Sequence, residues 1–124
     1  MNRSSIYLYS GLGALIYSLY AGFKYYAITG KGLISGSKAK KMIQNGEIKN
    51  IIDVRTETEF NMGHYKRAKN IPVTSINEEI SLNKKKGILV YCNTGQRARR
   101  AAEKLRELGY EKVYYIEGTY HSLR

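Results

Sequence analysis

The 124-residue sequence contains no tryptophan, one proline, one cysteine and two histidines. A single cysteine excludes an intramolecular disulfide and is typical of a protein in a reducing compartment. The histidines, His64 and His121, lie 57 residues apart, and with one cysteine they do not make a cluster of metal ligands. We therefore expect no metal site and no resident cofactor.

Acidic residues are also scarce, with 10 Asp and Glu against 21 Lys and Arg, and the formal net charge is +11. A charge of this size and sign favours contact with nucleic acid, an anionic membrane surface or other anions. The basic residues are dispersed along the chain, and no nucleic-acid-binding motif accompanies them. We therefore expect no nucleic-acid partner, and a surface that faces a membrane or attracts anions.

Charge is absent altogether from residues 4–23. Twenty helical residues span about 30 Å, which is the thickness of the hydrocarbon core of a bilayer. The segment lacks the charged face of an interfacial helix and the small residues of a signal-peptide cleavage site. We interpret residues 1–28 as an uncleaved transmembrane helix that attaches the protein to a membrane.

Basic residues near the ends of this segment predict its orientation. Only Arg3 precedes it, whereas lysines follow it at positions 24, 31, 38, 40 and 41. The positive-inside rule then places the C-terminal domain in the cytoplasm. Small residues recur at positions 10, 14, 18 and 22, and such a stripe lets two membrane helices approach closely. One interpretation is a homodimer that forms through this helix. The other is that the small residues have no role in association, because such residues are common in any membrane helix.

The glycine-rich residues 29–36 are predicted to be a linker, and residues 37–124 a single domain with one core. Apolar runs typical of strands occupy residues 33–34, 51–54, 68–71, 87–91 and 112–116, and helical patterns occupy residues 38–43, 76–82 and 97–108. Strands that alternate with helices predict an α/β sandwich with a largely parallel central sheet.

Side chains at the helix starts refine this prediction. Ser37 is expected to cap the helix over residues 38–43, and Thr74 the helix over residues 76–82. Glu57 and Glu59 are expected to begin a further short helix, with Phe60 as its anchor in the core.

The lone cysteine, Cys92, stands directly after the strand pattern of residues 87–91 and opens the polar loop of residues 92–97. Amides of a loop that enters a helix point inward and bind an anion, and the helix N-terminus adds partial positive charge. Such surroundings stabilise the thiolate form of a cysteine, which is the nucleophile. The loop therefore favours a nucleophilic Cys92 over a small buried hydrophobe that closes a strand.

Three more segments accompany this loop in order: Ile-Ile-Asp-Val-Arg at 51–55, Glu-Phe-Asn-Met-Gly-His-Tyr at 59–65 and Ala-Lys-Asn-Ile-Pro at 68–72. From about Leu33 to the C-terminus, the chain resembles a rhodanese domain in the order and spacing of these motifs. The resemblance implies a three-layer sandwich and a sulfurtransferase. Cys92 would take a sulfane sulfur from thiosulfate or a small persulfide and pass it to a thiol or cyanide.

The resemblance also implies roles for other residues. It assigns the binding of the persulfide and of the substrate to Asn93, Thr94, Gly95, Gln96 and Arg97. Asp53 and Arg55 would brace the loop, with a purely structural role as the alternative, and His64 would lie near the pocket rim. A histidine beside a glycine is more often a structural residue than an acid or base. Because the chain has no second cysteine, the acceptor must come from outside.

Two other functions are weighed against sulfur transfer. The loop has four residues between Cys92 and Arg97, whereas the related phosphatases place five there. The narrower loop suits a sulfur atom better than a tetrahedral phosphoryl or arsenate group, so a Cys-dependent phosphatase or arsenate reductase is the weaker alternative. A non-catalytic binding module at the membrane is the other, although it would need neither Cys92 nor Arg97.

The C-terminal end departs from the family pattern. Family members commonly close with a glycine pair and a tryptophan, but here Gly118 is followed by Thr119 and the chain has no tryptophan. Tyr120 or Leu123 is expected to fill that space. The departure affects packing beside the loop, so it bears on turnover more than on fold.

Overall fold

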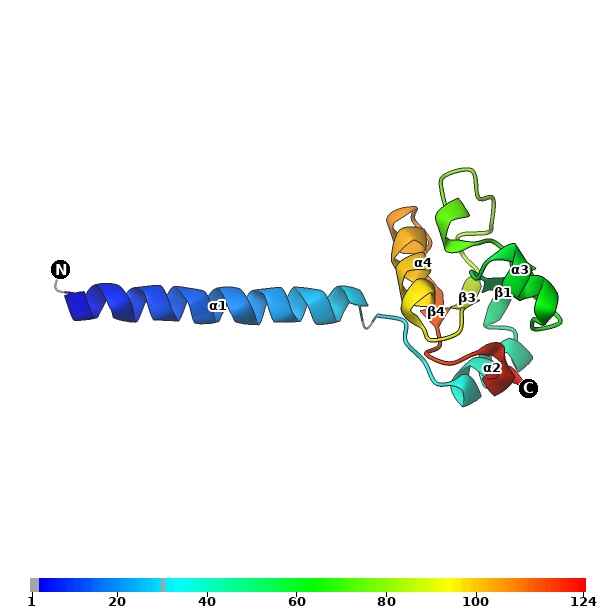
Figure 1. The fold of residues 1–124 in the computed structure, drawn as a ribbon, viewed down its shortest axis with the longest axis horizontal. Coiled ribbons are helices and arrows are strands. Elements are labelled where there is room, and N and C mark those ends of the chain that lie inside the picture. The colour runs from blue at the N-terminus through cyan, green and yellow to red at the C-terminus, as the bar shows by residue number, and fades with distance from the viewer. Residues whose placement is uncertain (1–2, 30) are drawn as a thin grey trace. The chain divides into compact units, whose positions relative to one another are not determined.

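Figure 1 shows a computed structural model of the chain. The structure describes residues 3–29 and 31–124, and the side chains of residues 9–23 and 31–124. It divides into two compact units, with the division between Lys31 and Gly32. The first unit is a single helix, α1 (Arg3–Thr29), and the second holds all the strands of the described chain.

Helix α1 exposes large apolar side chains along its described length, among them Leu12, Leu15, Ile16, Leu19 and Phe23. Tyrosine, serine and glycine residues interrupt these side chains and lower the mean hydropathy of the segment. Within the described residues, no helix is long and apolar enough to cross a bilayer. The prediction of a transmembrane helix over residues 1–28 is therefore not supported. Lys24, used above for the orientation, lies outside the described side chains.

The second unit is built on a four-stranded parallel sheet in the order β2-β1-β3-β4. The strands are β1 (Ile48–Asp53), β2 (Ala68–Asn70), β3 (Gly87–Tyr91) and β4 (Val113–Tyr115). All five residues of β3 are buried, as expected of a central parallel strand covered on both faces. The predicted α/β architecture with a parallel sheet is confirmed.

Two helices cover opposite faces of this sheet. Because successive strand side chains point to opposite sides, each strand contributes apolar residues to both faces. On one face, Ile52 and Val90 pack in a cluster with Leu105 of α4 (Gln96–Glu107). On the other face, Ile51 packs in a cluster with Met42 of α2 (Gly36–Gln44). The short helix α3 (Glu57–Met62) follows β1, and the C-terminal turn η2 (Tyr120–Leu123) packs with α2.

The helix predicted over residues 76–82 does not form. Only the short 3₁₀ turn η1 (Val73–Ser75) is present, and irregular chain follows it. The side chain of Asn77 accepts the Glu79 N–H, and the Tyr110 hydroxyl donates to the Ile80 carbonyl. These side chains satisfy backbone groups that a helix would have paired internally. The apolar residues at 76, 80 and 82 still pack against the α4 face of the core.

Two smaller expectations were also wrong. Ser35, not Ser37, caps α2, because its hydroxyl accepts the Lys38 N–H at 3.1 Å. Phe60 is not a core anchor, since α3 has no buried residue. Its ring instead stacks on His64, with 3.6 Å between the ring centroids.

The core cluster beneath α4 gives a direct test of this packing. We expect Leu105→Ala to lower the free energy of unfolding by about 2–5 kcal/mol, because Leu105 is fully buried and its loss leaves a cavity. Arg100→Ala, on the exposed side of the same helix, should change it by less than about 0.5 kcal/mol. Urea unfolding of the two variants measures both values, and equal effects would contradict the assigned core.

Candidate active site

Cys92 occupies the first position after β3, in the loop that leads into α4. Its side chain is buried, with 1% of the residue exposed. The sulfur accepts two backbone hydrogen bonds, from the Gly95 N–H at 3.1 Å and the Ala98 N–H at 3.4 Å. N–H donors at the start of a helix favour negative charge on the atom at which they point. The loop therefore directs two N–H donors at the Cys92 sulfur, as an anion-binding loop does.

The backbone conformation at Gly95 allows the chain to turn from the loop into α4 with the Gly95 N–H directed at the Cys92 sulfur. Gly95 is the N-cap of α4 and has a φ of 94°, in the left-handed region that favours glycine. A Cβ atom there would lie 2.9 Å from the Cα atom of Glu117. Gly95 was predicted as a loop donor, whereas Ala98 was missed. Ala98 is the third residue of α4, and the free N–H groups of a helix's first turn were the signal that identifies it.

Arg97 is engaged by a carboxylate from α3. Its Nη1 and Nη2 atoms donate to Oε1 and Oε2 of Glu59 at 2.7 and 3.0 Å. The Glu59 carboxylate also accepts from the Asn93 amide at 2.8 Å and forms a capping box with Thr56. The hydrogen bonds from Arg97 are the largest cause that lowers the Glu59 pKa from its ordinary 4.5 to about 2. The pairing also raises the pKa of Arg97.

Asp53 and Arg55 form a second, buried ion pair at the end of β1. Nη2 of Arg55 lies 2.7 Å from Oδ2 of Asp53, and the residues are 6% and 0% exposed. The same guanidinium donates to the Gly63 carbonyl at 2.6 Å and to Oδ1 of Asn93 at 3.4 Å. The hydrogen bond to Asp53 is the largest cause that raises the Arg55 pKa. Through Asn93, this pair reaches the loop that carries Cys92.

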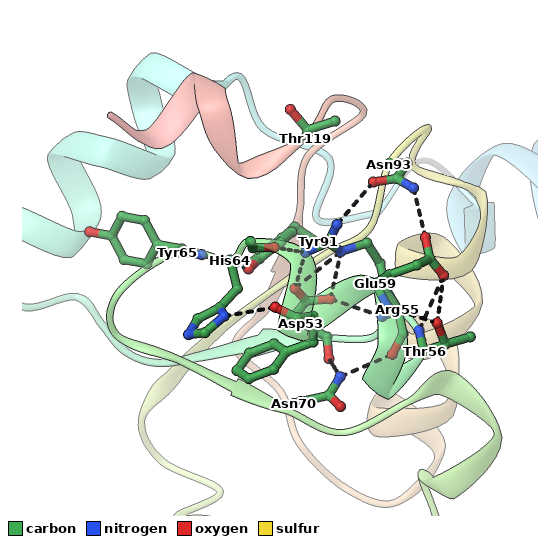
Figure 2. Close-up of polar contacts among 12 residues, drawn as sticks. Asp53, Arg55, Thr56, Glu59, His64, Tyr65, Asn70, Tyr91, Asn93 and Thr119 are labelled. Carbon is green, nitrogen blue, oxygen red and sulfur yellow. Dashed lines mark hydrogen bonds and ion pairs between the residues drawn. The ribbon is translucent and has the colours of Figure 1, made fainter.

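Asn93 lies between Arg55 of one ion pair and Glu59 of the other, as Figure 2 shows. Its side-chain oxygen faces Arg55 and its nitrogen faces Glu59. An amide is suited to this position because it carries an acceptor and a donor on one planar group. The amide therefore holds the loop from both sides.

Three contacts around β1 and β3 were not found from the sequence. The Asn70 amide donates to the carbonyl oxygens of Asp53 and Arg55, and so holds the backbone after β1. The Tyr91 hydroxyl accepts the Tyr65 N–H at 3.0 Å, and burial raises the Tyr91 pKa. The Glu59–Arg97 pair was also missed, although Thr56-x-x-Glu59 is a capping-box pattern that indicates where Glu59 points.

The remaining predicted residues lie around two cavities. His64 lines one of about 560 Å³ together with Tyr65, Lys66, Arg67, Tyr120 and Arg124. Its Nδ1 atom lies 2.9 Å from the Phe60 carbonyl oxygen. Thr94, Gly95 and Gln96 line a separate cavity of about 130 Å³. The structure thus brings Asp53, Arg55, Asn93 and Arg97 into one network around the loop. It places His64 on the larger of the two cavities, which Thr94, Gly95 and Gln96 do not line.

Tyr120 and Leu123 are the residues that were expected to fill the space of the family's tryptophan. Both are buried in the cluster beneath α2. Tyr120 also reaches toward the site, since its ring lies 5.8 Å from the Tyr91 ring and 5.4 Å from the Arg55 guanidinium. The guanidinium is 5.8 Å from the Tyr91 ring, so it lies close to both tyrosines.

A parallel sheet covered by helices on both faces, with a cysteine loop at the end of its central strand, defines a cysteine-loop α/β domain. Residues 35–124 match the rhodanese-like domain family. The chain belongs to the rhodanese-like domain family, and the resemblance noted in the sequence is confirmed.

Individual relatives agree with this family. A Staphylococcus aureus rhodanese-like domain protein is 29% identical, with a TM-score of 0.64 over 74% of this chain and 90% of that one. A human single-domain sulfurtransferase shares the fold at 21% identity, with a TM-score of 0.64 over 73% and 93% of the two chains. The tRNA uridine(34) hydroxylase of Erwinia tasmaniensis is 34% identical over 74 residues, which are 54% of this chain. The match spans about a fifth of that relative.

The positive φ at Gly95 leads to a prediction. We expect Gly95→Ala to destabilise the protein by about 1–3 kcal/mol, because alanine is strained at this φ and its Cβ would press on Glu117. Gly118→Ala is the matched control, since a Cβ at Gly118 meets no atom within 4 Å. Thermal unfolding compares the two variants, and a control that unfolds as early as Gly95→Ala would contradict the assigned strain.

The low pKa of Glu59 predicts how stability varies with pH. A carboxyl with a depressed pKa stabilises the fold above its unfolded pKa and loses that contribution as pH falls. The stability difference between wild type and Glu59→Gln should therefore be constant above pH 4.5 and shrink as pH falls toward about 2. Urea unfolding across this range measures it. A difference that does not vary with pH would show that the carboxylate is not paired.

Proposed function

We propose that this protein is a sulfurtransferase that carries a sulfane sulfur on Cys92. The Cys92 thiolate attacks the outer sulfur of the donor, and the donor's S–S bond breaks. Its electron pair leaves with sulfite when the donor is thiosulfate, or with a thiolate when the donor is a small persulfide. An acceptor thiolate or cyanide then attacks the outer sulfur of the Cys92 persulfide and regenerates the Cys92 thiolate.

The observation that carries this proposal is the pair of N–H groups directed at the Cys92 sulfur, from Gly95 at 3.1 Å and Ala98 at 3.4 Å. Such donors stabilise a negative sulfur both as the attacking thiolate and as the persulfide. Membership of the rhodanese-like family supports it, and so does the fold shared with a human single-domain sulfurtransferase.

The activity named for the hydroxylase relatives is not carried over. The match covers about a fifth of the hydroxylases of Erwinia tasmaniensis and Escherichia fergusonii. The activity of those whole proteins is therefore not assigned to this chain. A role in sulfur transfer instead follows from the cysteine loop itself. The acceptor is external, because the sequence has one cysteine and no second thiol to resolve the persulfide.

The cytoplasmic location of the domain and a homodimer through the N-terminal helix are separate from this proposal and stay predictions. The transmembrane attachment is not supported, and the proposal does not depend on it.

Intact-mass spectrometry tests the proposal directly. The full chain is incubated with thiosulfate and, separately, with a small persulfide. We expect a species heavier by one sulfur atom, which Cys92→Ser does not form and which cyanide or a thiol returns to the starting mass. Cys92 is the only cysteine, so no other thiol contributes to the signal.

The alternatives predict different results. The absence of an adduct with every sulfane donor would overturn the proposal and leave a non-catalytic binding module. Hydrolysis of an aryl phosphate, or reduction of arsenate, that is lost in Cys92→Ser would overturn it in favour of the phosphatase or reductase.

A further inference from the structure

The net charge of the side-chain network that holds the loop differs from the net charge of the chain as a whole. The formal net charge is +11, yet the two guanidinium groups that the loop network contains each face a carboxylate. Arg55 pairs with Asp53, and Arg97 pairs with Glu59. The four charges of this network cancel. The network therefore offers a doubly charged donor no unneutralised guanidinium.

The Glu59–Arg97 pair also occupies the geometry that an anionic donor would use. A guanidinium binds a sulfonate or carboxylate through two parallel N–H groups, and both Nη atoms of Arg97 already donate to Glu59. The two side chains are each 29% exposed, so they lie where a small donor can meet them. The sulfonate group of a donor would have to displace the Glu59 carboxylate from Arg97, or approach that carboxylate, which carries the same sign of charge.

Glu59 is held firmly in this position. Its Oε1 accepts from the backbone N–H and the hydroxyl of Thr56, at 3.3 and 3.0 Å, and its Oε2 accepts from the Asn93 amide at 2.8 Å. These bonds add to the two from Arg97. Displacing it would break hydrogen bonds on α3 and on the loop at once.

We propose that Glu59 is a specificity-determining residue that makes the Cys92 loop discriminate against dianionic donors such as thiosulfate and favour small persulfides without a sulfonate. This inference rests on the proposed sulfur transfer, and it names the donor class. The charge of Glu59 acts on the approaching donor, while the attack by Cys92 is the same for both donor classes.

The test compares Cys92 persulfide formation in wild type and Glu59→Gln. The donors are thiosulfate and the persulfide of 2-mercaptoethanol, and intact mass gives a second-order rate constant for each. Glutamine keeps the capping box with Thr56 and removes the charge. We expect the rate constant with thiosulfate to rise on the order of tenfold, the factor that about 1.4 kcal/mol of barrier produces. The constant with the persulfide should change by less than about threefold.

Glu57→Gln is the matched control. Glu57 lies in the first turn of the same helix and is exposed, and the substitution removes the same charge. The ratio of the two rate constants should stay at the wild-type value. A ratio that rises equally in Glu57→Gln would show a general field effect and would overturn the assignment to Glu59.

A second variant separates charge from loop positioning. Glu59→Asp keeps the charge but shortens the side chain, so it should keep most of the discrimination against thiosulfate. If Glu59→Gln lowers both rate constants alike, Glu59 positions the loop and the inference fails, while the sulfurtransferase proposal stands. If wild type forms no persulfide with either donor, the proposed function fails, and the inference fails with it.

Discussion

Two N–H groups directed at one sulfur atom are the constraint on which this structure depends. Gly95 and Ala98 reach Cys92 from the same helix start, and both can do so only if β3 ends and α4 begins at fixed places. Burial of β3 on both faces fixes where this strand ends. The packing of Leu105 and its neighbours against the sheet fixes where α4 begins. The core thus holds the loop in shape.

Local pairing determines the electrostatics of the site more than the net charge does. A buried charge is costly unless a partner neutralises it, which is why Asp53 and Arg55 occur together beneath the loop. Glu59 and Arg97 repeat the arrangement nearer the surface. Asn93 joins the two pairs through the opposite ends of one amide group. A strongly basic chain therefore presents a neutral network around its cysteine.

Much of the fold was predictable because the apolar runs are short and well separated. The strand at residues 87–91 agrees with β3 residue for residue, and α4 begins one residue before the predicted helix. The helix over residues 76–82 was wrong for an instructive reason. The spacing of its apolar residues correctly indicated burial, but it did not show that Asn77 and the distant Tyr110 hydroxyl would bind the backbone groups. The predicted transmembrane helix rested on the length of an uncharged segment, but the tyrosines and serines of that segment lower its hydropathy, and no described helix is apolar enough to cross a bilayer.

The sequence by itself determined the cysteine loop, because the strand, the cysteine, the glycine with positive φ and the helix start are contiguous and their geometry is local. It also determined the family through motifs in order. Only the tertiary structure decided what the loop arginine faces. Glu59 and Arg97 are 38 positions apart, and they meet because parallel strands β1 and β3 end side by side at the same edge of the sheet. A contact of that kind depends on strand pairing, which the residues near Arg97 do not encode.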